Sequence, residues 1–441
     1  MATINEATRL CKRIMLTNLL TNDYSIAVTP LLSGKHGIGK SQVAKSIAKD
    51  IGGISITIEG GTLKEGEITG IPYQYHNANG EIEFRFLPYY VIKRIQEAEK
   101  VISVEQNREK DMASVLDGVE NSFSQDNLSF EEKIEMIRSK KVTPVVIFFD
   151  EINRTDMAVF RELMNVILTR TVNGYRLPWW VFIMAAMNPA TQNSIYTTND
   201  MDPAQLDRFI KIKVRESSEE WLNYAIDHNV DRTLMEFISN HTQALSSDSK
   251  EMEDTDKAMP SPRGWNMVDL ILKSKDRLDV FFNINELEEK ESDIRSIISA
   301  KVGSEAAIMY FTSLNDNTKL VMADDLFAEG IDSISKENIE LIRNQSTARN
   351  SITTKSIIQF LKANIDRLND DEFSSNINKI LKEYTKLLDS SSKLLFALSL
   401  ANGEETVSED LFSYVYEIFD DDLIDMLQAN SLNELRISEC A

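Results

Sequence analysis

The sequence predicts an α/β domain built on a parallel sheet, followed by regions that are almost entirely helical. Residues 27–59 hold a β-like run ending in glycine, a glycine-rich loop, a helix and a second strand, which is how a parallel α/β sheet begins. Residues 145–149 form a short apolar run that is typical of a buried strand. From about residue 216 onward, apolar residues recur at helical spacing.

Length and composition define the broad class of protein. The 441 residues exceed one ordinary domain, so two or three domains are expected. The longest apolar runs fall far short of the ~20 residues that a membrane helix needs. The N-terminal residues lack the apolar core of a secretory signal. We therefore expect a cytoplasmic protein without a membrane partner.

Cysteine usage and charge narrow the class further. Cys11 and Cys440 are the two cysteines, at opposite ends of the sequence, and the four histidines show no metal-ligand spacing with them. Neither a disulfide framework nor a zinc site is expected, and a reducing cytosol fits. The net charge of −22 repels phosphate backbones, so nucleic acid is not an expected partner, although a local basic patch remains compatible.

The pattern along the chain predicts three regions. We expect an α/β nucleotide-binding domain over residues 1–215, a helical domain over 216–330 and a helical C-terminal region over 331–441. Within the first domain, alternating residues predict a hairpin insert at about 66–88. Residues 101–140 carry few large apolar side chains and predict a polar, partly helical insertion.

A phosphate-binding loop is the most specific motif. Residues 34–41, GKHGIGKS, match G-x-x-x-x-G-K-[ST], follow a strand and open a helix. A chance match is expected in only roughly one or two chains of this length per hundred. Backbone N–H groups and the helix N-terminus would bind the phosphates, Lys40 would add charge and Ser41 would ligate Mg²⁺. The predicted nucleotide-binding residues are Gly34, Lys35, His36, Gly37, Ile38, Gly39, Lys40, Ser41 and Gln42.

An acidic pair follows the apolar run at 145–149. Asp150 and Glu151 stand where ligands bind in an open α/β sheet, at the carboxyl end of a strand. Asp150 would hold Mg²⁺ through water, and Glu151 would polarise the attacking water as a general base. Alone, such a pair is usually a solvated strand end. It gains weight here because a phosphate loop precedes it.

The order of the later motifs resembles that of AAA+ ATPases of the MoxR type. The segments VVIFFDEINR, TVNGYRLPWW, MAAMNP, QLDRF and SPRG follow one another as in that group. The hairpin at 66–88 is similar to the insertion that this clade carries in its second helix. The resemblance covers roughly residues 5–330. It implies a P-loop NTPase with an AAA+ core and an all-α lid, ATP and Mg²⁺ as cofactors, and a homo-oligomeric, hexameric ring.

The resemblance also implies roles for single residues. Asn188 would be the sensor-1 residue that orients water with Glu151, although a strand-terminal turn is the ordinary alternative. Arg208 would be the arginine finger that reaches the nucleotide of a neighbouring subunit, and an ordinary surface salt bridge is the alternative interpretation. Arg154 is the second candidate for the intersubunit role. Arg263 would be the sensor-2 residue, which reaches the bound phosphates from the helical lid. The alternative interpretation is an exposed arginine at a helix N-terminus without a role in catalysis.

Two segments depart from the family pattern. The polar stretch 101–140 lengthens the gap before the acidic pair, and the tail after about residue 330 has no signature of the group. Tyr73 and Tyr75 in the hairpin are candidates for gripping a substrate in a ring pore, but cross-strand packing is the preferred interpretation.

Three functions fit these observations. The first is a ring-shaped ATPase that remodels a protein partner, for which the resemblance implies proteins with von Willebrand A domains. The alternative is a nucleic-acid-dependent motor of the same clade, which could use GTP. A scaffold that binds nucleotide without hydrolysis is disfavoured because Glu151 and Asn188 are both present.

Overall fold

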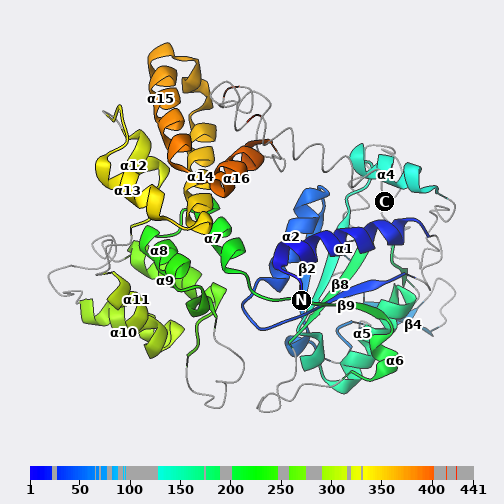
Figure 1. The fold of residues 1–441 in the computed structure, drawn as a ribbon. Coiled ribbons are helices and arrows are strands. Elements are labelled where there is room, and N and C mark those ends of the chain that lie inside the picture. Colours follow the sequence, from blue (N-terminus) through cyan, green and yellow to red (C-terminus); the bar gives the residue numbers. More distant parts are fainter. Residues whose placement is uncertain are drawn as a thin grey trace. The chain divides into compact units, whose positions relative to one another are not determined.

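The chain divides into two compact units, which are described separately (Figure 1). Unit 1 comprises Met1–Ser217 with Asp248–Asp256, and unit 2 comprises Ser218–Ser247 with Lys257–Ala441. The domain boundary expected at residue 215 stays a prediction. The computed structural model describes residues 1–21, 27–64, 66–68, 71–76, 82–87, 93, 95, 128–172, 175–188, 201–246, 258–274, 291–314, 319–328, 331–401, 414 and 424.

Unit 1 is built on a five-stranded parallel sheet, as the sequence predicts. The strand order is β2-β5-β8-β1-β9, so β1 and β8 are neighbours although far apart in the sequence. All four neighbouring pairs are parallel. The strands are β1 (Thr29–Ser33), β2 (Ile54–Glu59), β5 (Val145–Asp150), β8 (Val181–Met187) and β9 (Phe209–Lys213).

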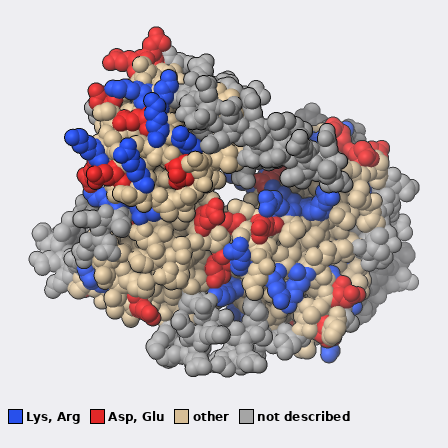
Figure 2. Space-filling model, in the orientation of Figure 1, with Lys and Arg blue, Asp and Glu red and all other residues tan. Residues whose placement is uncertain are grey.

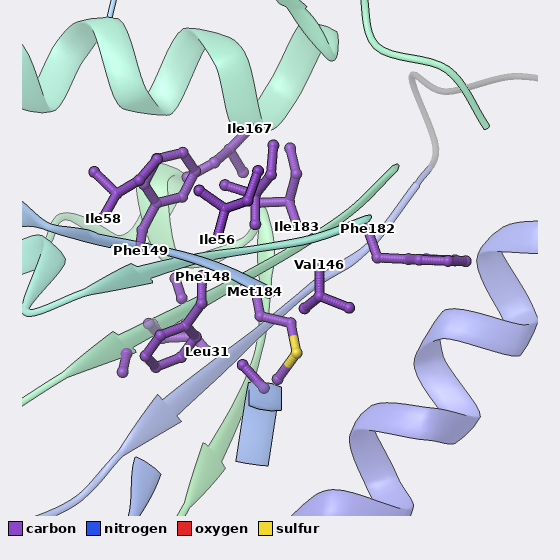
Figure 3. Packing of buried hydrophobic residues seen from close by; sticks show 14 of the residues in the cluster. Leu31, Ile56, Ile58, Val146, Phe148, Phe149, Ile167, Phe182, Ile183 and Met184 are labelled. Atoms are coloured by element: carbon purple, nitrogen blue, oxygen red, sulfur yellow. The ribbon is translucent and has the colours of Figure 1, made fainter. Parts of the chain in front are cut away.

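Apolar side chains on both faces of the central strands form the core of unit 1. Successive residues of a strand point to opposite faces. In Figure 3, Phe148 therefore lies on one side of the sheet, and Phe149, Ile58 and Ile167 lie on the other. Because both faces are buried, β5 (through Phe149) and β8 read as continuous apolar runs.

Helices cover these two faces of the sheet. Asp150 lies on the same face as Phe148, and its hydrogen bond to Ser41 places α2 (Lys40–Asp50) over that face. Helix α1 (Ile4–Leu19) packs beside α2. Helix α5 (Met157–Thr169) contributes Ile167 to the opposite face (Figure 3). The two faces therefore lie beneath different helices, and the phosphate loop opens the helix on the Asp150 face.

Two short hairpins accompany the sheet. Strands β3 (Ile71–His76) and β4 (Ile82–Leu87) pair in antiparallel fashion, within the range expected for the insert. The side chains of Tyr73 and Tyr75 lie outside the described part of the structure, so their predicted packing stays a prediction. Strands β6 (Thr171–Val172) and β7 (Tyr175–Arg176) form the second hairpin.

Part of the predicted polar insertion is helical. Helix α4 (Phe130–Arg138) begins at a capping box formed by Ser129 and Glu132, in which each side chain accepts from the other residue's backbone N–H. Residues 101–127 lie outside the described residues. The remaining short elements of unit 1 are η2 (Gly60–Thr62), η4 (Ile152–Arg154) and α6 (Pro203–Leu206).

Every regular element described in unit 2 is helical, and two apolar clusters form its cores. One cluster draws on residues 221–320 with Ile352, and the other on residues 321–397. The change between clusters falls near the predicted division at residue 330, which stays a prediction. The helices are α7 (Ser218–Asp227), α8 (Arg232–Asn240), η5 (Thr242–Leu245), α9 (Pro262–Ser274), α10 (Glu291–Val302), α11 (Ser304–Ser313), α12 (Ala323–Phe327), α13 (Lys336–Asn344), α14 (Thr347–Ala363), η8 (Ile365–Asn369), α15 (Asp371–Leu387) and α16 (Ser390–Ala401).

Helix length and composition bear on membrane insertion. Among the residues that the structure describes, no helix combines the length and the apolar character needed to cross a membrane.

Candidate active site

The phosphate loop connects the end of β1 to the start of α2. Gly37 has φ 75° and Gly39 has φ 104°, a left-handed region that side chains rarely adopt. Gly34 is needed for space instead, because a Cβ there would lie 2.6 Å from Ile38 Cδ1 and 2.8 Å from the Val214 carbonyl oxygen. These glycines allow the backbone to curl at the N-terminus of α2.

The Lys40 ammonium group is buried within the loop. Lys40 is only 6% exposed, and its Nζ donates to the carbonyl oxygens of Gly34 at 2.6 Å and Lys35 at 2.7 Å. Its third partner is Asn188 Oδ1, at 2.7 Å. Three acceptors match the three donors of an ammonium group, so the cation is held at the mouth of the loop.

The Ser41 hydroxyl lies against the acidic pair. Ser41 Oγ donates to Asp150 Oδ2 at 2.6 Å, and Asp150 Oδ1 accepts from the Glu151 backbone N–H at 3.0 Å. The contact joins the first turn of α2 to the end of β5, across 109 residues of sequence. A hydroxyl and a carboxylate at this distance are oxygen ligands of the type that Mg²⁺ takes.

Glu151 is held at both carboxylate oxygens. Its Oε1 accepts from Asn188 Nδ2 at 3.0 Å, and its Oε2 accepts from Arg154 Nη1 at 2.8 Å. Its backbone has φ 51°, an uncommon conformation for a residue other than glycine. The chain therefore turns sharply after β5, and the turn directs the Glu151 side chain toward Asn188.

Asn188 joins the phosphate loop to the general-base candidate. It stands directly after β8, and this strand lies between β1 and β5 in the sheet. The side-chain oxygen binds Lys40 and the side-chain nitrogen binds Glu151. The structure thus brings together Lys40, Ser41, Asp150, Glu151 and Asn188, as the sequence predicts.

Asn153 supports Asn188 and was not singled out by the sequence analysis. The Asn153 side chain is 1% exposed, and its Nδ2 donates to the Asn188 carbonyl oxygen at 2.8 Å. The only signal in the sequence is a polar residue two positions after Glu151, between Ile152 and Arg154. Such a signal does not distinguish a buried amide from a solvated turn.

Gly60 allows a close approach that the sequence also did not reveal. A Cβ at Gly60 would lie 2.7 Å from the Glu151 carbonyl oxygen and 2.8 Å from Thr155 Oγ1. The η2 turn therefore packs directly on the segment that follows β5. Only glycine leaves room for this contact without displacing backbone.

The Lys35 side chain forms an ion pair with a residue outside the strand ends that carry the other site residues. Its Nζ donates to Glu216 Oε1 at 2.9 Å, and both side chains are about a third exposed or less. The pair ties the phosphate loop to the last residues of unit 1. Gln42 and His36, also predicted to bind nucleotide, are exposed in the first turn of α2 and in the loop respectively.

The two distal arginines stay predictions. Arg208 is half-buried between α6 and β9, and Arg263 is exposed in the first turn of α9, in unit 2. Neither side chain forms a hydrogen bond or an ion pair with another residue of the described ranges.

Comparisons with known proteins identify similar structures and one family. Among the solved structures that are similar to the chain, three each cover 71% of it. *Caenorhabditis elegans* PCH-2 has 12% identity, 68% of its own chain covered and a TM-score of 0.28. A *Thermotoga maritima* RuvB variant has 13% identity, 73% covered and a TM-score of 0.29. The *Thermotoga maritima* RuvB Holliday junction branch migration motor has 12% identity, 68% covered and a TM-score of 0.28.

These TM-scores are too low to support any conclusion about this chain. No curated protein matches the sequence. Residues 30–214, however, match the family described as ATPase family associated with various cellular activities (AAA). That range contains all five residues that the structure brings together at the strand ends. The similarity to this family thus concerns residues 30–214, the part of the chain that carries the phosphate loop and the acidic pair.

Proposed function

We propose that the protein binds Mg-ATP at the phosphate loop and hydrolyses it. The observation that carries this proposal is the hydrogen-bonded series from Lys40 through Asn188 to Glu151, beside the contact between Ser41 and Asp150. It places a cation for the phosphates, oxygen ligands for the metal and a carboxylate for the attacking water at one edge of the sheet.

The residues of the site fit both the phosphates of ATP and a Mg²⁺ ion. The positive φ angles of Gly37 and Gly39 let the loop backbone curl as a phosphate requires, and α2 directs its positive end at the same point. Mg²⁺ at such a loop takes one or two protein oxygens and fills its other positions with phosphate and water. The described residues accordingly contain no cluster of three or more acidic, histidine or cysteine side chains suited to a metal.

The chain's own residues have distinct tasks in this reaction. Bound Mg²⁺ would neutralise charge on the phosphates as the terminal phosphoryl group is transferred. Lys40 stabilises negative charge on the same oxygens, and Glu151 accepts a proton from the attacking water. Asn188 fixes both groups at once, because one amide holds the ammonium and the carboxylate.

The motif order supports a finer proposal. We infer a MoxR-type ATPase that forms a homo-oligomeric ring, most simply a hexamer, and remodels a protein partner such as one with a von Willebrand A domain. Arg208 would act on the nucleotide of a neighbouring subunit, and Arg263 would reach the bound phosphates from the helical lid. The absence of a described partner for either guanidinium is compatible with these roles.

The test is ATP turnover against protein concentration, with the size of the assembly measured in parallel. Glu151→Gln should retain ATP binding and lose turnover. Arg208→Ala should have lower turnover than the wild type only at the protein concentrations at which the wild type is assembled. Hydrolysis by Glu151→Gln at the wild-type rate would refute the catalytic assignment. A rate per subunit that is independent of concentration would refute the ring.

A further inference from the structure

Local geometry places the Arg154 guanidinium on the Glu151 carboxylate. Glu151 precedes the 3₁₀ turn η4 and Arg154 is its last residue. In such a turn, residues three apart lie above one another. The Arg154 backbone N–H donates to the Glu151 carbonyl oxygen at 2.8 Å, and Arg154 Nη1 donates to Glu151 Oε2, also at 2.8 Å. The turn itself therefore imposes the pairing.

This contact means that both carboxylate oxygens of Glu151 already accept a hydrogen bond. Asn188 occupies Oε1 and Arg154 occupies Oε2. A general base must direct a lone pair at the water whose proton it takes. Two donors on opposite oxygens fix the plane of the carboxylate and restrict its rotation toward a water molecule.

The pair is also accessible enough to break. The side chains of Arg154 and Glu151 are 31% and 33% exposed. Ion pairs at this exposure contribute little free energy, because water and salt screen them. By contrast, the contact between Asn188 and Lys40 involves a buried cation. Of the two donors on Glu151, Arg154 is therefore the one that can leave without disturbing the phosphate loop.

We propose that Arg154 is a positioning residue that restrains the general base of its own subunit, and that its release from Glu151 accelerates hydrolysis. This inference rests on the proposed function of Glu151. It differs from an intersubunit role for Arg154, because the guanidinium acts here on the Glu151 carboxylate of its own subunit.

The experiment compares Arg154→Ala with Arg154→Lys in the full-length protein, measuring kcat and KM for ATP. Arg161→Ala is the matched control, because Arg161 is an exposed arginine of α5 without a partner among the described residues. We expect Arg154→Ala to raise kcat about two- to five-fold at unchanged KM, the range that loss of a partly exposed ion pair allows. Arg154→Lys should restore the wild-type rate, and Arg161→Ala should match the wild type.

Each other outcome contradicts the restraint. A kcat that falls in Arg154→Ala would show that Arg154 assists the reaction, and an unchanged kcat would show that the ion pair is inert. Arg154→Gln, which keeps most of the side-chain volume, replaces the alanine variant if the latter melts at a lower temperature than the wild type. Absence of turnover in the wild type would refute the proposed function itself. If Glu151→Gln abolishes turnover but Arg154→Ala does not raise kcat, the proposed function stands and only the restraint by Arg154 is refuted.

Discussion

The orientation of a single amide determines how the site is held together. Asn188 Oδ1 faces the Lys40 ammonium and Asn188 Nδ2 faces the Glu151 carboxylate, so oxygen meets a cation and nitrogen meets an anion. The reverse orientation would set donor against donor at Lys40 and acceptor against acceptor at Glu151. The charges on both sides therefore fix the amide. An aspartate at this position would place a second carboxylate beside Glu151.

Lys40 permits a direct test of nucleotide binding. Lys40→Ala removes the cation at the phosphates, so the stabilisation by ATP should disappear. Saturating ligand at 100 times Kd stabilises a protein by about 2.7 kcal/mol. The measurement is the shift of Tm on adding Mg-ATP. Lys45→Ala is the control, because Lys45 is exposed on the same helix. An undiminished shift in Lys40→Ala would place ATP elsewhere.

At the residue scale, the sequence predicted the motif residues but not their supports. Lys40, Ser41, Asp150 and Glu151 belong to patterns whose spacing reflects their chemistry. Asn153 belongs to no such pattern. Its role depends on a turn that buries one amide against the end of another strand, and a single sequence carries no record of that burial.

At the scale of elements, the close packing of η2 on η4 positions the general-base candidate. A Cβ at Gly60 would collide with the Glu151 carbonyl oxygen, whereas a Cβ at Gly61 would lie 3.8 Å from Arg154 Cβ, an ordinary contact. The two neighbouring glycines therefore form a matched pair. They separate the effect of the close approach from that of losing a glycine in this turn.

Gly60→Ala should destabilise unit 1 and slow turnover. Backbone must move to relieve the collision, and overpacking of this kind costs about 1–3 kcal/mol. The same displacement would shift Glu151 away from Asn188. Denaturant unfolding and kcat are the measurements, with Gly61→Ala as the control that should stay near the wild type. Equal effects of the two substitutions would show that the contact does not matter.

The buried face of α1 predicts an inert thiol. Cys11 is fully buried, and burial raises the pKa of its thiol from 9.0 to about 12. The folded protein therefore keeps the Cys11 thiol protonated at pH values at which the unfolded chain has already lost this proton. The contribution of Cys11 to the free energy of unfolding is fully present below pH 9.0, and it is lost as the pH rises toward about 12. In a Cys440→Ser variant, a thiol reagent should react only on unfolding. Rapid reaction of the native protein would contradict the burial of Cys11.

The elements themselves were predictable to different degrees. Continuous apolar runs identified β5 and β8, and the phosphate loop identified the start of α2. The strand order was not predictable from these runs, because no local pattern states which strand lies between two others. The ion pair of Lys35 with Glu216, 181 residues apart, was hidden for the same reason.

At the scale of the whole molecule, the distribution of charge bears on the choice between a protein partner and a nucleic-acid partner. The net charge is −22, and on the face shown in Figure 2 basic side chains lie among acidic ones. Helix α15 illustrates the mixture, since it begins with Asp371 and Glu372 and later exposes Lys379, Lys382 and Lys386. Intermixed charge of this kind does not form a continuous track for a phosphate backbone.

We therefore expect DNA to leave the ATPase rate unchanged at physiological salt. Fluorescence anisotropy of labelled single- and double-stranded DNA, read beside turnover, provides the measurement. A protein that uses DNA would bind it with strong salt dependence and turn over faster in its presence. Stimulation by DNA would favour the motor over the remodelling ATPase.

The buried ammonium of Lys133 has a mechanical consequence. Its Nζ donates to the carbonyl oxygens of Leu19 and Thr21, which fastens α4 to the far end of α1. Helix α1 has 16 residues, which makes it a rod of about 24 Å. At its other end, Ile4 Cδ1 lies 3.7 Å from the place where a Cβ of Gly39 would stand. A pull on α4 would thus be transmitted along this rod to the phosphate loop without passing through the sheet.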